Sequence, residues 1–260
     1  MLGYLINELK KPIYVFFYSA FISIVSIYIS VKVFEKYESF FITFLITLSL
    51  IPFFKKIVNK EVKNTLKVSD KNFFERYLNT IYFYLLVLFG LVFGMSLVYI
   101  FLPSNISEKI FEKQIEVIKK IRGMFIGNLF NNIPLLGIFF HNLSVLLLCF
   151  ILSLLYGLGS LLIISWNATV LATAIGMLTK NYGIFFYPQA FLTFLPHGTL
   201  EFISFFLAGL AGAILSVASA RRKIFEIKKF YRDSFKLLLY SILILFVAAI
   251  IETLILTIRI

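Results

Sequence analysis

The residues best suited to chemistry in this chain are His197 and Glu201, in the hexapeptide Pro-His-Gly-Thr-Leu-Glu that begins at Pro196. Because they are four residues apart, their side chains share one face of a helix. An ionised carboxylate at the centre of a bilayer costs about 2.5–3.5 kcal/mol on insertion scales and therefore needs a partner or a wet cavity. The pair can hold a proton, coordinate a cation, form a hydrogen-bonded structural clamp or act in catalysis, and the spacing alone leaves these roles open.

Other polar residues lie near the predicted membrane spans. Asn167 follows Trp166, and we expect it to cap the helical segment that follows. His141 and Asn142 precede a predicted span, where helix capping or a headgroup contact accounts for them. Glu252 lies roughly two turns before the end of the last span, where it either pairs with a polar group or reaches the interface. We group Asn167 with His197 and Glu201 as the candidate polar site. His141, Asn142 and Glu252 are secondary candidates.

The sequence lacks the motifs of the common enzyme classes. It contains no His-Glu-x-x-His, no Gly-x-Ser-x-Gly and no P-loop. Two histidines exclude a three-His zinc site, and the single Cys149 excludes a disulfide framework and a thiolate metal site. We therefore expect no cofactor, no metal and no catalytic residue, with an intramembrane hydrolase built on His197 and Glu201 as the weakest alternative.

The composition identifies the chain as a polytopic helical membrane protein. Hydrophobic residues make up 60% and charged residues 15% of its 260 residues, against about 45–50% and about 25% in an ordinary globular domain. The 32 Phe residues add to an apolar surface larger than one soluble core can bury. The net charge of +12 comes largely from Lys and Arg next to apolar runs, which is typical of membrane-flanking loops. We predict an all-α transmembrane bundle and no nucleic-acid partner.

Apolar runs predict the spans of a single membrane domain covering residues 1–260. A span needs about 20 apolar residues, because the hydrocarbon layer is about 30 Å thick. The runs cover residues 12–31, 40–54, 78–102, 143–166, 196–220 and 237–258, of which 40–54 is short. With one further crossing discussed below, we predict six to seven spans.

The distribution of Lys and Arg predicts the orientation. Sixteen of the 25 lie in segments assigned to one side, at residues 10–11, 55–76 and 221–236, and eight lie in segments assigned to the other side. The positive-inside bias places the larger group, and with it the N-terminus, in the cytoplasm. We predict a multi-pass protein of the cell membrane whose basic inner linkers attract anionic lipid headgroups.

This topology requires residues 168–195 to cross the bilayer between two inward spans. The stretch is apolar on both sides of Lys180-Asn181-Tyr182-Gly183, and its second part contains Pro188. These features predict a broken helix of two half-length segments. Broken helices expose backbone groups, which are tolerated at membrane depth only inside protein or beside a wet cavity. We therefore expect the functional region here.

Residues 105–125 have the pattern of an amphipathic helix on the outer membrane face. Apolar residues fall on one side at 100° per residue and charged residues on the other. The charged side comprises Glu108, Lys109, Glu112, Lys113, Glu116, Lys119, Lys120 and Arg122. The helix either lies passively on the membrane or docks a protein partner.

Small residues predict close packing between helices. Gly90 and Gly94 are four residues apart in the third span, and Gly198, Gly209 and Gly212 lie along the span at residues 196–220. Small residues at such spacings let two helix backbones approach closely. We expect these glycines to be packing sites, with another helix against each span.

Residues 120–220 resemble the stage II sporulation protein M (SpoIIM) family of integral membrane proteins. The resemblance is carried by Asn167, Gly176, Pro196-His197-Gly198-x-x-Glu201, Ala208-Gly209 and Gly212. Phe202 stands where the family more often has Leu. The resemblance implies a membrane scaffold that works with peptidoglycan-degrading partners, as the namesake does during engulfment in spore formers. It does not by itself carry sporulation over to this chain, because the family extends beyond spore formers.

Three functions are consistent with the sequence. The first is a non-enzymatic scaffold or assembly factor with a protein partner on the amphipathic helix. The second is a transporter or channel for an ion or small solute, using the broken helix together with His197 and Glu201, since discontinuous helices often build midplane sites. The third is the hydrolase described above. A homo-oligomer is compatible with each of them.

Overall fold

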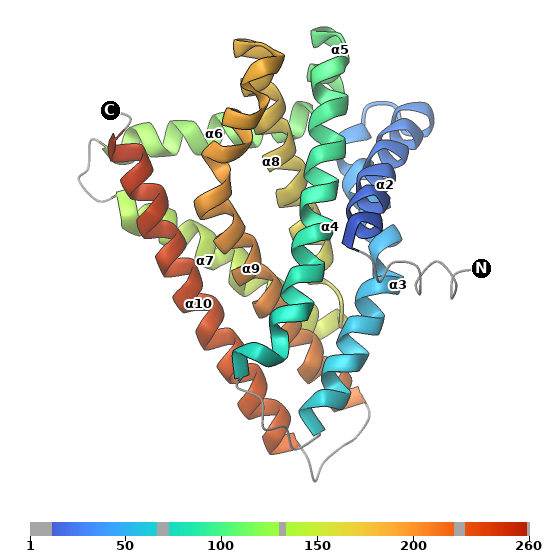
Figure 1. The fold of residues 1–260 in the computed structure, drawn as a ribbon, viewed down its shortest axis with the longest axis vertical. Helices are drawn as coiled ribbons and strands as arrows, with labels where there is room; N and C mark the ends of the chain where they lie inside the picture. The colour runs from blue at the N-terminus through green and yellow to red at the C-terminus, as the bar shows by residue number, and fades with distance from the viewer. Residues whose placement is uncertain (1–11, 67–72, 130–133, 221–226, 259–260) are drawn as a thin grey trace. The chain divides into compact units, whose positions relative to one another are not determined.

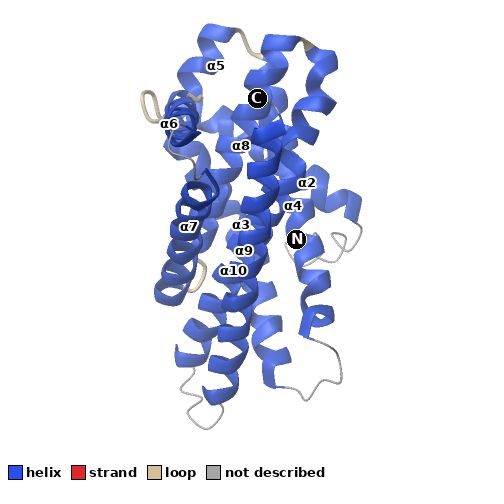
Figure 2. Ribbon diagram, turned by 90° about the vertical axis from the view of Figure 1, so that its left-hand side faces the viewer, coloured by secondary structure: helices blue, strands red, loops and turns tan. Residues whose placement is uncertain are grey.

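Every element of the protein is helical in the residues that the structure, a computed structural model, describes: 12–66, 73–129, 134–220 and 227–258. Figure 1 shows the long helices, and Figure 2 shows helices without strands in this part of the chain. The helices are α2 (Pro12–Val33), α3 (Glu38–Leu66), α4 (Phe73–Phe101), α5 (Ser104–Ile110), α6 (Glu112–Leu129), α7 (Pro134–Tyr156), α8 (Ser160–Tyr182), the 3-10 helix η1 (Ile184–Phe186), α9 (Tyr187–Ala220) and α10 (Ile227–Ile258).

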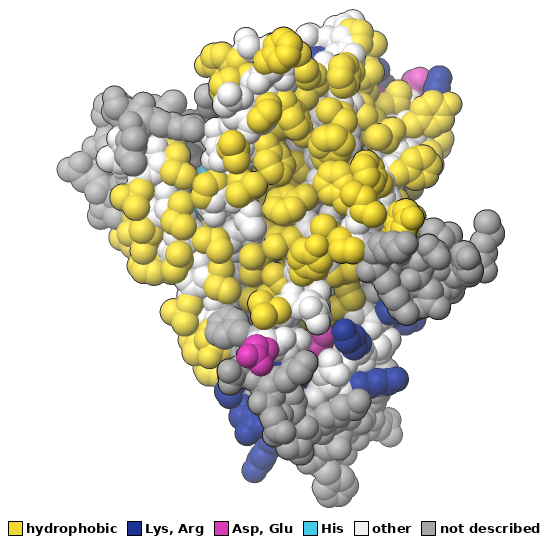
Figure 3. Space-filling view, in the orientation of Figure 1, with side chains coloured by type: hydrophobic (Ala, Val, Ile, Leu, Met, Phe, Trp, Pro, Cys, Tyr) yellow, Lys and Arg dark blue, Asp and Glu magenta, His cyan; other side chains and the backbone are white. Residues whose placement is uncertain are grey.

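Seven helices in the described residues are long and apolar enough to cross a membrane. They are α2, α3, α4, α7, α8, α9 and α10. Hydrophobic side chains cover much of the face in Figure 3, which suits a surface in contact with lipid. The predicted all-α polytopic bundle is confirmed.

The chain forms two compact units, each assembled from separate stretches of sequence. Unit 1 comprises residues 1–49, 82–127 and 165–194, and unit 2 comprises residues 50–81, 128–164 and 195–260. In unit 1, α2 packs closely on the second part of α4, and α5 and α6 are bonded to α3, α4 and α8. In unit 2, α7 packs along α10, with the rings of Phe139 and Phe246 5.5 Å apart between centroids.

The second span is longer than its apolar run. The prediction ended it at residue 54, where Lys55 and Lys56 begin a basic segment, but α3 continues to Leu66. Beyond Phe54, the residues Val58, Glu61, Val62 and Thr65 recur at helical spacing and are all buried. A buried side at helical spacing therefore continues beyond the apolar run, while the lysines stay on the exposed side of the helix.

The predicted broken helix at residues 168–195 is wrong. The preceding span is α7, which begins at Pro134 and ends before Gly157, a glycine with φ +73°. The next helix, α8, is continuous from Ser160 to Tyr182, and Gly183 with φ +93° ends it. After η1, α9 runs without a break from Tyr187 through Pro196 to Ala220. The prediction failed because the turn after Tyr156 is apolar and carries no polar signal, so the first part of α8 was assigned to the preceding span. The predicted ends at residues 220 and 258 coincide with the ends of α9 and α10.

Lys180 lies in the last turn of α8, at the interruption that the sequence predicts at residues 180–183. Its Nζ donates to the backbone oxygen of Leu102, at the end of α4, at 2.6 Å and to Ser107 Oγ of α5 at 2.9 Å. It also lies 5.1 Å from the centroid of the Tyr99 ring. A cation at a helix C-terminus satisfies carbonyl groups that have no partner within the helix. Lys180 therefore joins α8 to the turn between α4 and α5.

The amphipathic segment at residues 105–125 is divided into α5 and α6 at Phe111. Its inner side is buried against protein at Ser107, Ile110, Phe111, Gln114 and Ile115. Ser39 Oγ donates to the backbone oxygen of Ile110 at 2.7 Å, and Gln114 Nε2 donates to the backbone oxygen of Ser39 at 3.3 Å and to Thr169 Oγ1 at 3.2 Å. This part of the segment is therefore fixed to α3 and α8 within unit 1.

Four of the five singled-out glycines lie where helices meet closely. A Cβ added at Gly90 would collide with the backbone of Phe16, and one at Gly94 with the backbone of Ala20. In unit 2, a Cβ at Gly212 would collide with the backbone of α7 at Phe150, and one at Gly209 with the Ser160 side chain. Gly198 differs from the expectation, because a Cβ there would meet nothing within 4 Å.

These contacts predict opposite effects for two Gly→Ala substitutions. Gly94→Ala should lower the free energy of unfolding by about 1–3 kcal/mol, because α2 and α4 must separate to admit the methyl group. Gly198→Ala, the matched control in a helix with open space, should leave it unchanged or raise it by about 1 kcal/mol. Thermal unfolding of both variants in one detergent measures the difference. Equal losses would contradict the close packing at Gly94.

Candidate functional site

The intramembrane polar site joins three helices of unit 2. Asn142 of α7 donates from Nδ2 to Glu201 Oε1 of α9 at 2.8 Å. The carboxyl group of Glu252 in α10 lies within hydrogen-bonding reach of the carboxyl group of Glu201. The structure thus brings together one primary and two secondary candidates, from positions up to 110 residues apart in the sequence.

The chemistry of this cluster follows from its three side chains. A hydrogen bond between two carboxyl groups requires a proton on at least one of them, so the pair can bond directly only when it carries no more than one negative charge. The Asn142 amide supplies a further donor to Glu201. Mutual hydrogen bonding lowers the cost of placing polar groups at membrane depth. The arrangement can act as a clamp between α7, α9 and α10 or as a store for one proton.

The other candidates lie elsewhere in the helices. His197 is one turn before Glu201 in α9 and is buried, with 8% of its surface exposed. His141 is exposed and lies, with Asn142, inside α7 rather than before a span. Asn167 lies in the interior of α8 in unit 1, so the predicted helix cap at this residue is wrong. Its misplacement follows from the misplaced turn between α7 and α8.

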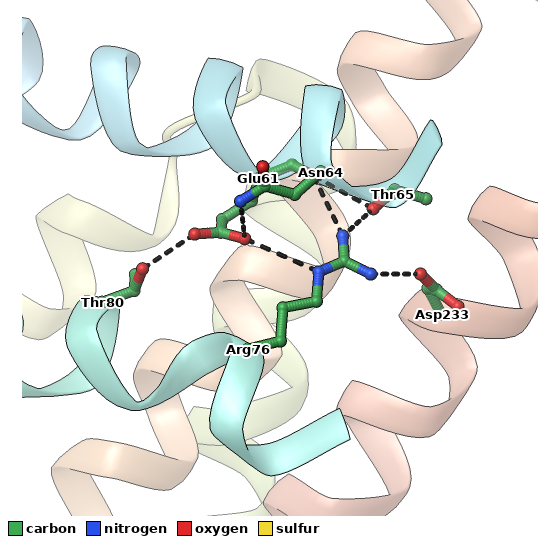
Figure 4. Close-up of polar contacts among 6 residues, drawn as sticks. All are labelled: Glu61, Asn64, Thr65, Arg76, Thr80 and Asp233. Carbon is green, nitrogen blue, oxygen red and sulfur yellow. Dashed lines mark hydrogen bonds and ion pairs between the residues drawn. The ribbon is translucent and has the colours of Figure 1, made fainter. Parts of the chain in front are cut away.

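A second polar cluster in unit 2 was missed from the sequence, and Figure 4 shows it around Arg76 at the start of α4. Arg76 Nη1 lies 2.9 Å from Asp233 Oδ2 of α10, and its Nε lies 3.9 Å from Glu61 Oε2 of α3. Arg76 Nη2 donates to Thr65 Oγ1 at 2.5 Å and to the backbone oxygen of Glu61 at 3.1 Å. Three helices therefore meet at one guanidinium group.

The Glu61 carboxylate is held from several sides. Thr80 Oγ1 donates to Glu61 Oε1 at 2.8 Å, and Asn64 Nδ2 donates to Oε2 at 3.3 Å. The Glu61 side chain is fully buried, while those of Arg76 and Asp233 are 13% and 9% exposed. Buried ions are retained only when such hydrogen bonds and opposite charges compensate their desolvation. The cluster is therefore a structural lock between α3, α4 and α10.

One sequence signal could have revealed this lock. Glu61 falls on the same helical stripe as Phe54, Val58 and Thr65, where an unpaired carboxylate would be buried. Arg76 and Asp233 gave no such signal, because they lie in the basic segments used for the topology prediction. Among the described residues, no group of three His, Cys, Asp or Glu side chains is placed to hold a metal ion.

The exposed side of α6 carries a charged row. Lys113 Nζ lies 2.8 Å from Glu116 Oε1 and 3.4 Å from Glu112 Oε1. The hydrogen bond from Lys113 lowers the pKa of Glu116, and the same bond raises the pKa of Lys113. Such surface pairs add little to stability, so their charges are available to a partner.

Comparison with models of known protein families identifies the family of this chain. The family model of stage II sporulation protein M matches residues 83–255. The chain belongs to the SpoIIM family. No curated protein and no solved structure matches it.

The matched SpoIIM region contains all three members of the intramembrane cluster, Asn142, Glu201 and Glu252. Of the Arg76 lock, only Asp233 lies within it, whereas Glu61 and Arg76 precede it. The SpoIIM match therefore covers the cluster completely and the lock only in part.

Removing the guanidinium group tests the lock. Arg76→Ala should lower the free energy of unfolding by about 3–5 kcal/mol, because it leaves two mostly buried carboxylates without their countercharge. Arg76→Lys should recover part of the loss, since an ammonium group keeps the charge but lacks the planar fork. Denaturation in detergent provides the measurement.

The control is Lys113→Ala, which breaks an ion pair on the exposed side of α6. We expect no measurable change in stability there, because solvent screens exposed pairs. If Arg76→Ala and Lys113→Ala unfold alike, the Arg76 cluster is not a lock.

Proposed function

We propose that this SpoIIM-family membrane protein is a non-enzymatic scaffold or assembly factor. The observation that carries the proposal is the cluster of Asn142, Glu201 and Glu252, in which the candidate polar side chains bond to one another across three helices. Groups used in this way stabilise an arrangement of helices. Membership of a sporulation-related family of membrane proteins supports the same function.

The charged outer side of α5 and α6 is the proposed docking surface. Its inner side is fixed to unit 1 through Ser107, Gln114 and their partners, so the outer side is presented by a rigid support. The described charged residues of this surface are Glu108, Lys109, Glu112, Lys113, Glu116, Lys119 and Lys120. A peptidoglycan-degrading enzyme is the class of partner that the family resemblance implies.

Neutralising the docking surface should remove the partner. Lys109→Gln, Glu112→Gln, Lys113→Gln and Glu116→Gln together should reduce the yield of the peptidoglycan-degrading enzyme that co-purifies with the full chain by about tenfold, since complementary charges select the partner. The control is Lys32→Gln with Lys36→Gln, exposed residues outside the surface. Unchanged association in the docking variant would contradict the proposed surface.

A transporter is the second candidate, and the carboxyl pair of Glu201 and Glu252 is the observation that favours it, because a shared proton is a common coupling ion in membrane carriers. The broken helix from which the sequence predicted a transporter is not present, since α8 and α9 are continuous helices. The two functions predict different results for an isosteric change at Glu201.

Under the scaffold proposal, Glu201→Gln should preserve folding and partner association, because the amide can accept from Asn142 and donate to Glu252. Glu201→Ala should lower the free energy of unfolding by about 1–3 kcal/mol, because it leaves polar partners unsatisfied. Thermal unfolding and co-purification measure both effects. Proton-coupled flux in vesicles that Glu201→Gln abolishes would favour the transporter instead.

A further inference from the structure

The C-terminal half of α3 has a basic side that neither the lock nor the docking surface uses. Lys56, Lys60 and Lys63 are exposed on one face of the helix. The half-buried Asn59 and Asn64 share this face, and the four later residues lie three, four, seven and eight positions after Lys56. At 100° per residue these spacings keep the five side chains on one face of the helix. They line a surface hollow of about 370 Å³. We propose that this hollow binds the headgroup phosphate of an anionic phospholipid.

The acidic and basic residues in the C-terminal half of α3 lie on different sides of the helix. Glu61 points toward Arg76 and Thr80, which engage its carboxylate (Figure 4). Asn64 donates one bond to the same carboxylate from the edge of the hollow. Within the described residues, no carboxylate forms an ion pair with the three lysines. The lock thus uses the acid of this helix and leaves three positive charges facing outward.

The depth of the hollow matches that of lipid headgroups. Lys56 lies 18 residues after Glu38, which corresponds to about 27 Å along the helix axis, and the hydrocarbon layer is about 30 Å thick. Lys60 and Lys63 lie one and two turns further on. Pro52, one turn before Lys56, is exposed and apolar. Figure 3 shows Lys and Arg side chains beyond the edge of the hydrophobic surface.

The side chains provide the chemistry that a phosphodiester requires. Three ammonium groups supply positive charge and hydrogen-bond donors to phosphate oxygens. Three cations favour an anionic lipid such as phosphatidylglycerol over zwitterionic phosphatidylcholine, because only the anionic lipid keeps a net charge. The site is independent of the proposed partner surface on α5 and α6.

The test measures phospholipid retained by the full chain in detergent. The chain is titrated with phosphatidylglycerol or phosphatidylcholine, and bound lipid is counted by native mass spectrometry. Lys56→Gln, Lys60→Gln and Lys63→Gln together should weaken phosphatidylglycerol binding by about 100-fold, at about 1 kcal/mol per lysine. Phosphatidylcholine binding should not change. A variant with Lys→Arg at the same three positions keeps the positive charges. It should bind phosphatidylglycerol as the wild type does, which shows that changing these side chains leaves the fold intact.

The matched control removes three exposed charges outside the hollow, by Lys32→Gln at the end of α2, Lys36→Gln in the turn after it and Lys228→Gln at the start of α10. It should retain phosphatidylglycerol binding. An equal loss in the control would overturn the proposal, because it would show unspecific attraction of the whole basic surface. Wild-type binding by the α3 variant, or failure of the wild type to prefer the anionic lipid, would also overturn it, and binding of an acidic protein segment would then be the better explanation.

Competition with soluble glycerophosphate separates a lipid from a free phosphate compound. If the site serves lipid, glycerophosphate at equal concentration should leave most phosphatidylglycerol bound, because acyl chains add to lipid affinity. If glycerophosphate displaces the lipid and needs the same three lysines, the lipid assignment is wrong.

Discussion

A polar group inside a bilayer must find its partner within the protein, and this constraint governs the arrangement of the helices. In unit 2 the carboxyl group of Glu201 accepts from Asn142 and lies within hydrogen-bonding reach of the carboxyl group of Glu252. In unit 1 the ammonium group of Lys180 is bonded to the end of α4 and to α5. In each case a side chain that is costly in isolation joins helices that are distant in the sequence. Apolar packing is non-directional, so these directional bonds help to specify which helices are neighbours.

The two clusters of unit 2 have different physical characters. The Arg76 lock contains formal charges and involves the last turns of α3 and the first turns of α4 and α10. The cluster around Glu201 is built from carboxyl and amide groups within the spans. Both include α10, so the helix is held at its start by Asp233 and nearer its end by Glu252. These two attachments restrain α10 along much of its length.

Hydropathy was sufficient to predict an all-helical membrane protein, because about 20 apolar residues in a row have few other uses. Boundaries failed where the chain turns without polar residues, as at Tyr156-Gly157-Leu158-Gly159. The interruption predicted at residues 180–183 coincides with the end of α8, where Lys180 also bonds to the end of α4. Glu201 was recognised from its cost in a membrane, but its partner Asn142 is 59 residues away. Only Glu61 carried an unused local signal, its place on a buried stripe. Pairings between distant helices depend on packing that no local pattern contains.

The central claim is that Glu201 and Glu252 form a dry, hydrogen-bonded clamp, and infrared spectroscopy of the full chain in lipid tests it most directly. The account predicts a protonated carboxyl stretching band that Glu201→Gln removes and that exchanges slowly when the sample is transferred to deuterated water. A clamp closed to water permits exchange only when the helices open. The absence of this band, or its complete shift immediately after transfer, would show an ionised or water-filled site and contradict the account.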